Sequence, residues 1–121
     1  MPRTSFAAQT PKGPFPGVVS AGDLDLVMTA GDDVDGNEVP FISSRMFVVA
    51  RNVHASAPYT VTFTSAPDPI SKRSADISAF SMAAGDVIGF FVSRAGWEQV
   101  GGLLYLDCED ASIEFAVVVL P

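Results

Sequence analysis

Apolar and polar residues alternate with a period of two along most of this chain. The clearest case is the segment 59–63, in which a tyrosine, a valine and a phenylalanine alternate with threonines. The segments 24–29 and 112–119 follow the same rule. A period of two is typical of a strand with one buried face, whereas a helix repeats its apolar residues every three or four positions. The pattern therefore predicts strands, and no window of about 11 residues has the apolar stripe of a helix.

Turn-forming residues separate these segments from others of strand length. The remaining strand-sized segments are 45–51, 76–80, 86–92 and 102–107. About seven or eight short strands at this spacing are typical of an antiparallel β-sandwich or a jelly roll, so we predict an all-β fold for residues 23–121. The segment 86–92 and the final segment are apolar on both faces, which is expected of central strands that are covered on each side.

Residues 1–22 lack this alternation and carry four of the nine prolines and three of the ten glycines. Because proline supplies no backbone donor and fixes φ, we predict an extended N-terminal arm rather than a strand or a helix. Arg3 and Lys12 make the arm basic, and Phe6 and Phe15 are unexpected in a solvated tail. Three placements stay open: the arm folds back on its own domain, lies on a neighbouring subunit, or is disordered.

The charge balance narrows the partners of this chain of 121 residues. It has 14 acidic and 7 basic residues, for a net charge of −7, yet 48% of its residues are hydrophobic and only 17% are charged. That composition suits one folded domain and not a disordered acidic chain. A negative surface repels phosphate backbones, so we expect no nucleic-acid partner. No run reaches the roughly 18 apolar residues of a membrane span, and the N-terminus lacks the apolar region of a signal peptide. We expect synthesis in the cytoplasm and no membrane partner.

The acidic loop 31–38 resembles a calcium-binding loop at first sight. If Gly36 were the sixth position of an EF-hand loop, Gly31 and Ile42 would stand at positions one and twelve, where acidic ligands are required. The match fails at both ends, and the flanking segments are predicted strands. We therefore predict a polar turn and no metal site, with a calcium loop of another type left open.

Two further residues carry reactive side chains. His54, the single histidine, lies in a predicted loop without a nucleophile elbow or a glycine-rich oxyanion motif. Cys108, the single cysteine, lies among three acids that are expected to raise its pKa and weaken it as a nucleophile. The chain also lacks a glycine-rich phosphate-binding motif. We predict no catalytic residues, no cofactor and no enzymatic activity.

Arg94 and Trp97 lie in a predicted connection between two strands, and Trp97 is the single tryptophan. The tryptophan is either a plug in the core or an anchor for a partner, because Trp and Arg are enriched at the centres of interfaces.

Several segments, taken in order, resemble a family of β-sandwich virion proteins of tailed phages and prophages. They are Thr29-Ala30-Gly31-Asp32, Asp35-Gly36-Asn37-Glu38-Val39-Pro40-Phe41, Phe47-Val48-Val49-Ala50-Arg51-Asn52, Tyr59-Thr60-Val61-Thr62-Phe63, residues 77–80, Ala83-Ala84-Gly85-Asp86, Gly96-Trp97, Leu103-Leu104-Tyr105-Leu106 and the final segment 115–121. The resemblance covers about residues 23–121. Two loops depart from the family pattern: the usual Asn-Gly-Asn turn begins here with Asp35, and the usual Gly-Arg-Thr-Gly-Asp-Ile approach is replaced by residues 71–77.

The resemblance implies a capsid decoration protein, which binds the outer surface of the expanded head at seams between subunits. Such a protein resides in the virion, has the major capsid protein as its partner, and is typically a trimer at three-fold positions. We expect the partner contacts at Arg3, Phe6, Lys12, Phe15, Arg94 and Trp97. Two alternatives stay open: a tail or neck component, and a carbohydrate-binding sandwich in which Trp97, Tyr105 and the acidic loop line a sugar site.

Overall fold

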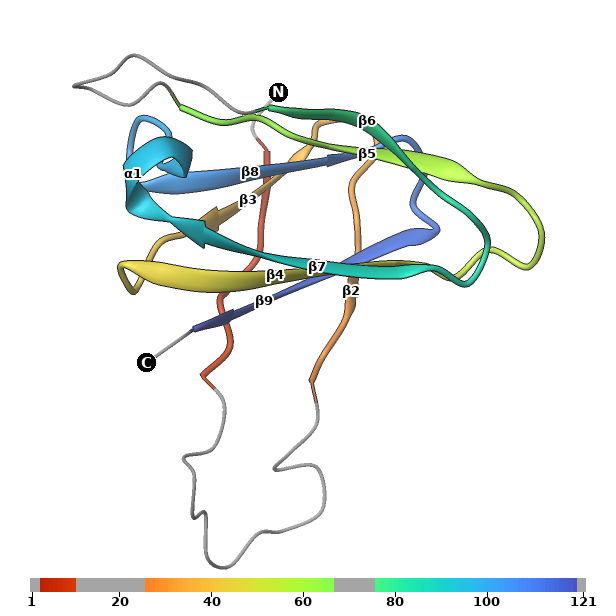
Figure 1. Cartoon of the computed structure of the whole chain (residues 1–121), viewed down its shortest axis with the longest axis horizontal. Helices are drawn as coiled ribbons and strands as arrows, with labels where there is room; N and C mark the ends of the chain where they lie inside the picture. Colours follow the sequence, from red (N-terminus) through yellow and green to blue (C-terminus); the bar gives the residue numbers. More distant parts are fainter. Residues whose placement is uncertain (1–2, 11–25, 67–75, 120–121) are drawn as a thin grey trace, which may run out of the picture.

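Two β-sheets lie face to face with the hydrophobic core between them (Figure 1). The computed structural model describes residues 3–10, 26–66 and 76–119, so Lys12 and Phe15 of the predicted arm lie outside the described residues. One sheet has five strands in the order β1-β3-β8-β5-β6, and the other has four strands in the order β2-β9-β4-β7. The predicted all-β sandwich is confirmed.

The described part of the chain has nine strands and one short helical turn. They are β1 (Thr4–Ser5), β2 (Thr29–Ala30), β3 (Asn37–Pro40), β4 (Arg45–Asn52), β5 (Tyr59–Phe63), β6 (Ile77–Met82), β7 (Val87–Ser93), α1 (Arg94–Trp97), β8 (Leu103–Cys108) and β9 (Ile113–Val119). Neighbouring strands are antiparallel except β1 and β3, which are parallel. The prediction of seven or eight strands falls short because no predicted segment covers β1, which lies in the predicted arm, or β3, which begins inside the predicted acidic turn 31–38.

The predicted segment 59–63 coincides with β5, and its buried residues are Val61 and Phe63, as the alternation indicates. The predicted strand at 24–29 is wrong for most of its length. Only its last residue and the one after it form a strand, β2, while residues 26–28 have no strand pairing and residues 24 and 25 lie outside the described residues.

The two segments predicted to be central strands differ in position. β9 lies between β2 and β4, so this prediction is confirmed. β7 lies at the edge of the four-stranded sheet and pairs with β4 alone among the described strands, so the prediction of a central strand at 86–92 is wrong. A run that is apolar on both faces does not reveal whether its second face is covered by the same chain or by another molecule.

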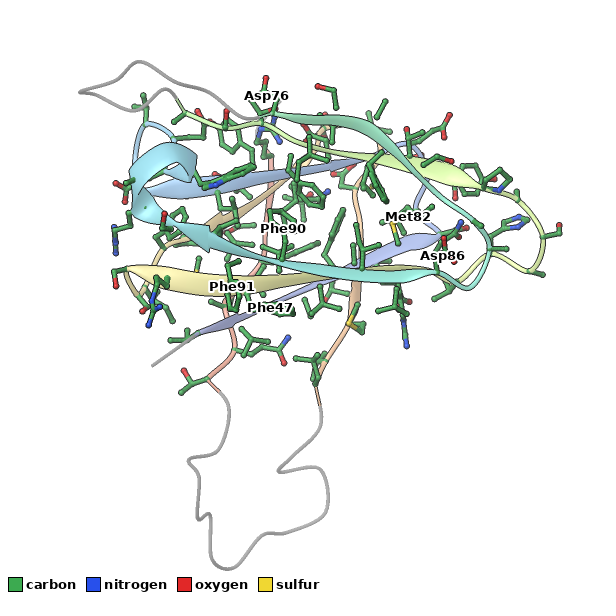
Figure 2. The ribbon with its side chains drawn as sticks, in the orientation of Figure 1. Phe47, Asp76, Met82, Asp86, Phe90 and Phe91 are labelled. Atoms are coloured by element: carbon green, nitrogen blue, oxygen red, sulfur yellow. The ribbon has the colours of Figure 1, made fainter. Side chains whose placement is uncertain are left out.

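The core consists of side chains that point inward from both sheets. Its largest fully buried members are Phe63, Phe115, Met46, Met82, Leu104, Leu106, Ile113, Val39, Val48, Val61, Val92 and Val117. The ring of Phe63 packs edge-on against Phe90 and Phe115, with centroids 4.8 and 6.2 Å away. These contacts join β5 of one sheet to β7 and β9 of the other. Figure 2 shows Phe90 directed between the sheets, with Phe47 and Phe91 on the opposite side of their sheet.

Two buried asparagines secure loops at the ends of the strands. The Asn37 side chain accepts a hydrogen bond from the Asp32 N–H at 2.8 Å and donates one to the Leu106 carbonyl at 3.0 Å. Asn52 likewise donates to the Met82 carbonyl at 3.0 Å. Each asparagine side chain thereby ties a loop to a strand, and buried hydrogen bonds of this kind are costly to break.

Candidate interaction surfaces

Residues 3–10 lie across the edges of both sheets on one side of the sandwich, and we call them the edge strap (Figure 1). Near its start, the Phe6 N–H donates to the Glu38 carbonyl of the five-stranded sheet at 2.8 Å. Near its end, the Gln9 N–H donates to the Val117 carbonyl of the four-stranded sheet at 2.7 Å. The described part of the arm therefore lies on its own domain.

The prediction of an arm without strand pairing is wrong for the edge strap. Proline excludes ladder pairing only where a proline stands, and the four prolines of the arm are Pro2, Pro11, Pro14 and Pro16. The strap lies between the first two of them, so each of its residues keeps its N–H. It can therefore add to both sheet edges and cover backbone groups that would otherwise face solvent.

Arg3 is held by the five-stranded sheet. Its guanidinium pairs with Asp107 and lies 3.9 Å from the centroid of the Tyr105 ring. It also donates to the Asn37 carbonyl at 3.1 Å, and its side chain is 26% exposed. A contact of Arg3 with a partner would therefore compete with an ion pair and a cation–π contact inside the domain.

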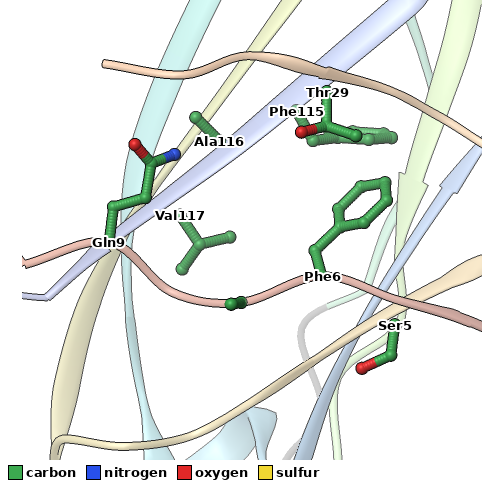
Figure 3. A pocket seen from close by; sticks show the side chains of 8 residues that line it. Ser5, Phe6, Gln9, Thr29, Phe115, Ala116 and Val117 are labelled. Atoms are coloured by element: carbon green, nitrogen blue, oxygen red, sulfur yellow. The ribbon is translucent and has the colours of Figure 1, made fainter. Parts of the chain in front are cut away.

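Phe6 is the aromatic residue of the strap that packs against the core. Figure 3 shows its ring directed toward Thr29 and Phe115. A hollow of about 260 Å³ lies beside it, lined by the strap, β2 and β9. A second hollow of about 290 Å³ is lined by the strap together with Pro40 and Ile42. The strap thus closes the edge of the sandwich with one ring and leaves space on either side of it.

Gln9 joins the strap to the segment before β2 through its side chain. Its carboxamide accepts a hydrogen bond from the Val27 N–H at 2.9 Å and donates one to the Val27 carbonyl at 2.7 Å. The side-chain amide acts in place of a strand partner for Val27. Sequence reasoning missed this residue because its partner lies 18 positions away and no local pattern marks the pair.

Arg94 and Trp97 lie in α1, directly after the edge strand β7. The Trp97 ring packs against Phe90 with centroids 5.7 Å apart, and it is partly buried against the core, which is the arrangement of a core plug. Arg94 pairs with Glu98 and donates to the Phe41 carbonyl at 2.8 Å, while its side chain remains 44% exposed. Of the four predicted contact residues that the structure describes, Arg3 and Phe6 therefore lie in the strap and Arg94 and Trp97 lie in α1.

The acidic loop between β2 and β3 is closed by hydrogen bonds to the Asp32 carboxylate, which come from the loop itself and from Thr4 of the edge strap. The Asp32 carboxylate accepts from the Thr4 hydroxyl at 2.7 Å and from the N–H groups of Val34 and Asp35 at 2.9 and 3.0 Å. These bonds, the one from Thr4 foremost, lower the pKa of Asp32. This is the arrangement of a polar turn. Within the described ranges, no three or more His, Cys, Asp or Glu residues are grouped to hold a metal ion.

His54 and Cys108 are each engaged by their surroundings. Nδ1 of His54 accepts hydrogen bonds from the N–H groups of Ser56 and Ala57 at 3.1 and 2.8 Å, so the imidazole closes its own loop. Burial, followed by the charge of Asp33, raises the pKa of Cys108 to about 11. A thiol with that pKa is almost wholly protonated at neutral pH and is a poor nucleophile.

The outward side of the four-stranded sheet is mostly apolar, and we call it the apolar face. Three cross-strand rows run over β9, β4 and β7: Val118-Phe47-Phe91, Ala116-Val49-Gly89 and Glu114-Arg51-Val87. Phe91 and Val87 are 69% and 63% exposed. Phe47 packs edge-on against Phe91 with centroids 5.4 Å apart, and the Arg51–Glu114 ion pair at 2.7 Å closes one end. Exposed apolar side chains that lie together in this way mark an interaction site.

The outward side of the five-stranded sheet carries polar side chains where the apolar face carries apolar ones. Thr60, Thr62, Tyr105 and Asp107 lie there, since their neighbours Val61 and Leu106 are buried.

Sequence reasoning did not single out the apolar face of the four-stranded sheet. The signal that could have located it is the segment 86–92, which is apolar on both faces. We interpreted that pattern as a central strand covered on both faces by its own chain, although another molecule can equally cover one face.

The chain matches no family model, no curated protein and no solved structure. Among the described residues, no helix is long and apolar enough to cross a membrane.

Proposed function

We propose that this chain is a non-enzymatic virion structural protein that binds the outer surface of a tailed-phage capsid. The observation that carries the proposal is the apolar face, because Phe91 is 69% exposed beside Phe47 on a folded domain. Such rings gain free energy when they are buried against a larger particle. The resemblance to decoration proteins in the sequence is the reason for proposing that this particle is a tailed-phage capsid.

In this proposal the chain stabilises the capsid lattice by mass action. A protein that binds the assembled lattice across a seam, and not its separated subunits, favours the lattice by about 2.7 kcal/mol at a free concentration 100 times its Kd. No covalent bond changes. The engagement of His54 in its own loop and the protonation of Cys108 are consistent with a role without catalysis.

The proposed partner is the major capsid protein, and the proposed assembly is a homotrimer at a three-fold position of the virion. The apolar face supplies the buried centre of the contact, with further contacts from Lys12, Phe15 and the exposed end of Arg94. Arg3, Phe6 and Trp97 serve the contact indirectly, because they hold the strap and α1 against the domain.

Co-sedimentation with purified heads of the same phage, before and after expansion, tests the proposal. We expect the chain to sediment with expanded heads and to raise their melting temperature. The double variant Phe47→Thr/Phe91→Thr keeps residues that favour strands but removes both rings, and it should bind at least about 10-fold more weakly. Phe80→Thr is the matched control, since Phe80 is 46% exposed on β6 of the other sheet, and it should bind like the unaltered chain.

Equal binding by all three proteins would remove the apolar face from the proposal. Sedimentation with tails or tail tubes instead of heads would favour the tail or neck component. Specific signals on a glycan array, without binding to heads, would favour the carbohydrate-binding sandwich.

The arm is tested separately with Lys12→Ala/Phe15→Ala. This variant leaves the edge strap in place, whereas deletion of residues 1–20 would also remove the Phe6 ring from the core. We expect weaker binding to heads or a smaller mass by light scattering, with cooperative melting unchanged. Unaltered affinity and mass would exclude both residues from the contact.

A further inference from the structure

The free side of β7 is a second surface, which adjoins the apolar face but involves the backbone. β7 pairs with β4 on one side, and no strand among the described residues covers its other side. We propose that this side pairs with β7 of a second copy of the chain in antiparallel orientation, so that two four-stranded sheets form one continuous sheet. This two-fold pairing joins two copies and is separate from the three-fold contact of the proposed trimer and from the particle that the chain joins.

The pairing of β7 with β4 determines which backbone groups remain on the free side. The Asn52 N–H donates to the Asp86 carbonyl at 2.9 Å, and the Arg94 N–H donates to the Ser44 carbonyl at 3.1 Å. Hydrogen-bonded pairs alternate along an antiparallel ladder, so the even-numbered residues of β7 bond to β4. The odd-numbered residues therefore point their N–H and C=O groups away from β4.

These outward groups lack the protection that is usual at a sheet edge. Along the described chain, no backbone hydrogen bond reaches the outward N–H groups of Val87, Gly89 or Phe91. β7 itself contains no proline, no charged residue and no register shift. β6, an edge strand of the other sheet, has a register shift opposite β5, and its Ala79 has a φ of +49°. Irregularities of this kind turn an edge away from a partner, so β7 is the edge suited to pairing.

A second copy is the occupant that the charges favour. When β7 pairs with itself about Phe90, Asp86 lies opposite Arg94 of the second copy at each end of an uncharged strand. Val87 then lies opposite Ser93 of the second copy. Odd-numbered residues thus face odd-numbered residues, and the outward N–H and C=O groups of the two copies meet. Although each copy carries a net charge of −7, β7 itself is uncharged, and Arg94 at its end pairs with Glu98 of its own chain and lies opposite Asp86 of the second copy.

Aromatic contacts between the copies favour the same register. Gly89 lies opposite Phe91 of the second copy. The Phe47 ring already lies over Gly89, since a Cβ there would stand 2.6 Å from its Cζ atom. Phe91 of each copy therefore reaches Phe47 of the other, and the two apolar faces become continuous.

Cysteine cross-linking tests the register. Hydrogen-bonded antiparallel pairs have Cα atoms about 5.5 Å apart, within reach of a disulfide. Within one chain, positions 87 and 93 are about 20 Å apart, because a strand rises about 3.3 Å per residue. In a Cys108→Ser background, Val87→Cys/Ser93→Cys should give a covalent dimer on mild oxidation, while each single variant should remain a monomer on a non-reducing gel.

No dimer from the double variant, or equal dimer from a single variant, overturns the proposed pairing. Amide exchange of the unaltered chain gives a readout without cysteines. The amides of Gly89 and Phe91 should become at least about 10-fold better protected as the protein concentration rises, while the amide of Ser81 on β6 keeps its rate. Concentration-independent exchange at both β7 amides also overturns the proposal. Capsids take no part in either measurement, so these outcomes are separate from those of the proposed function.

Discussion

The guanidinium of Arg3 lies 3.9 Å from the centroid of the Tyr105 ring, in a space that Gly36 leaves open. A Cβ at Gly36 would stand 2.6 Å from Nη1 of Arg3 and 2.5 Å from Oδ1 of Asp107. The backbone of Gly36 also has a φ of +80°, which few residues other than glycine adopt without strain. The start of the edge strap therefore depends on one glycine in the acidic loop.

Gly36→Ala should lower the free energy of unfolding by about 2–3 kcal/mol. About 1–2 kcal/mol comes from alanine at a positive φ, and about 1 kcal/mol from displacing the ends of Arg3 and Asp107, which must shift to make room for the Cβ. Gly85→Ala is the matched control, since Gly85 has a φ of +84° and nothing within 4 Å of its Cβ position. Gly85→Ala should lose only about 1–2 kcal/mol, which is what alanine costs at a positive φ. Urea unfolding measures both variants, and equal losses would contradict the close approach of Arg3 to Gly36.

Asn37→Ala should destabilise the fold by about 1–3 kcal/mol, because it leaves the Asp32 N–H without its partner and removes one of the hydrogen bonds to the Leu106 carbonyl. Asn37→Asp should cost at least as much, because an ionised carboxylate cannot donate a hydrogen bond and is costly to bury. Asp33→Ala, at an exposed position of the same loop, should change the free energy of unfolding by less than about 0.5 kcal/mol. Losses below about 1 kcal/mol for both Asn37 variants, measured by urea unfolding, would contradict the bonding described for this side chain.

Thr4→Val should raise the pKa of Asp32 toward its ordinary value of 3.8, because the Thr4 hydroxyl is the largest cause of its lowering. Since the pKa is lower in the folded chain, ionised Asp32 favours folding above pH 3.8, and that contribution is lost as the pH falls through the folded value. Carbon-13 NMR titration of the Asp32 carboxyl group measures the pKa in both proteins. Ser5→Ala, on the same strand, is the control. An identical pKa in Thr4→Val and the unaltered chain would mean that the Thr4 hydroxyl does not bind Asp32 in solution.

Cys108 should react slowly with iodoacetamide in the folded chain. A pKa of about 11 instead of 9.0 lowers the thiolate fraction at pH 8 about 100-fold, and partial burial slows the reagent further. Unfolding in urea should restore the ordinary rate. Mass spectrometry of timed samples gives both rates, and a folded rate within about 10-fold of the unfolded rate would contradict the raised pKa.

The sequence predicts those elements of the fold that are decided by local alternation. β5 coincides with its predicted segment because Val61 and Phe63 face the core while Thr60 and Thr62, which alternate with them, face outward. β2 is shorter than predicted because the side chain of Gln9, rather than a strand, pairs with Val27. No pattern of neighbouring residues contains that contact.

The candidate site was less predictable than the fold. Arg3, Phe6 and Trp97 were singled out as partner contacts on account of residue type, and each also has neighbours inside its own domain. Phe47 and Phe91 were not singled out, because alternation identifies apolar faces but not which of them stays uncovered. Position within the sheet decides that, and it depends on pairings between distant segments.

The hydrogen bond between Gln9 and Val117 joins positions about 110 residues apart. A ribosome that adds about 5–20 residues per second therefore reaches Val117 about 5–20 seconds after it has added Gln9. Throughout that interval Phe6 has no completed core to pack against, and β4, once made, lacks its neighbour β9. The nascent chain therefore exposes apolar residues such as Phe6 and Phe47 well before it can fold. The edge strap reaches its final position only after β9 has left the exit tunnel.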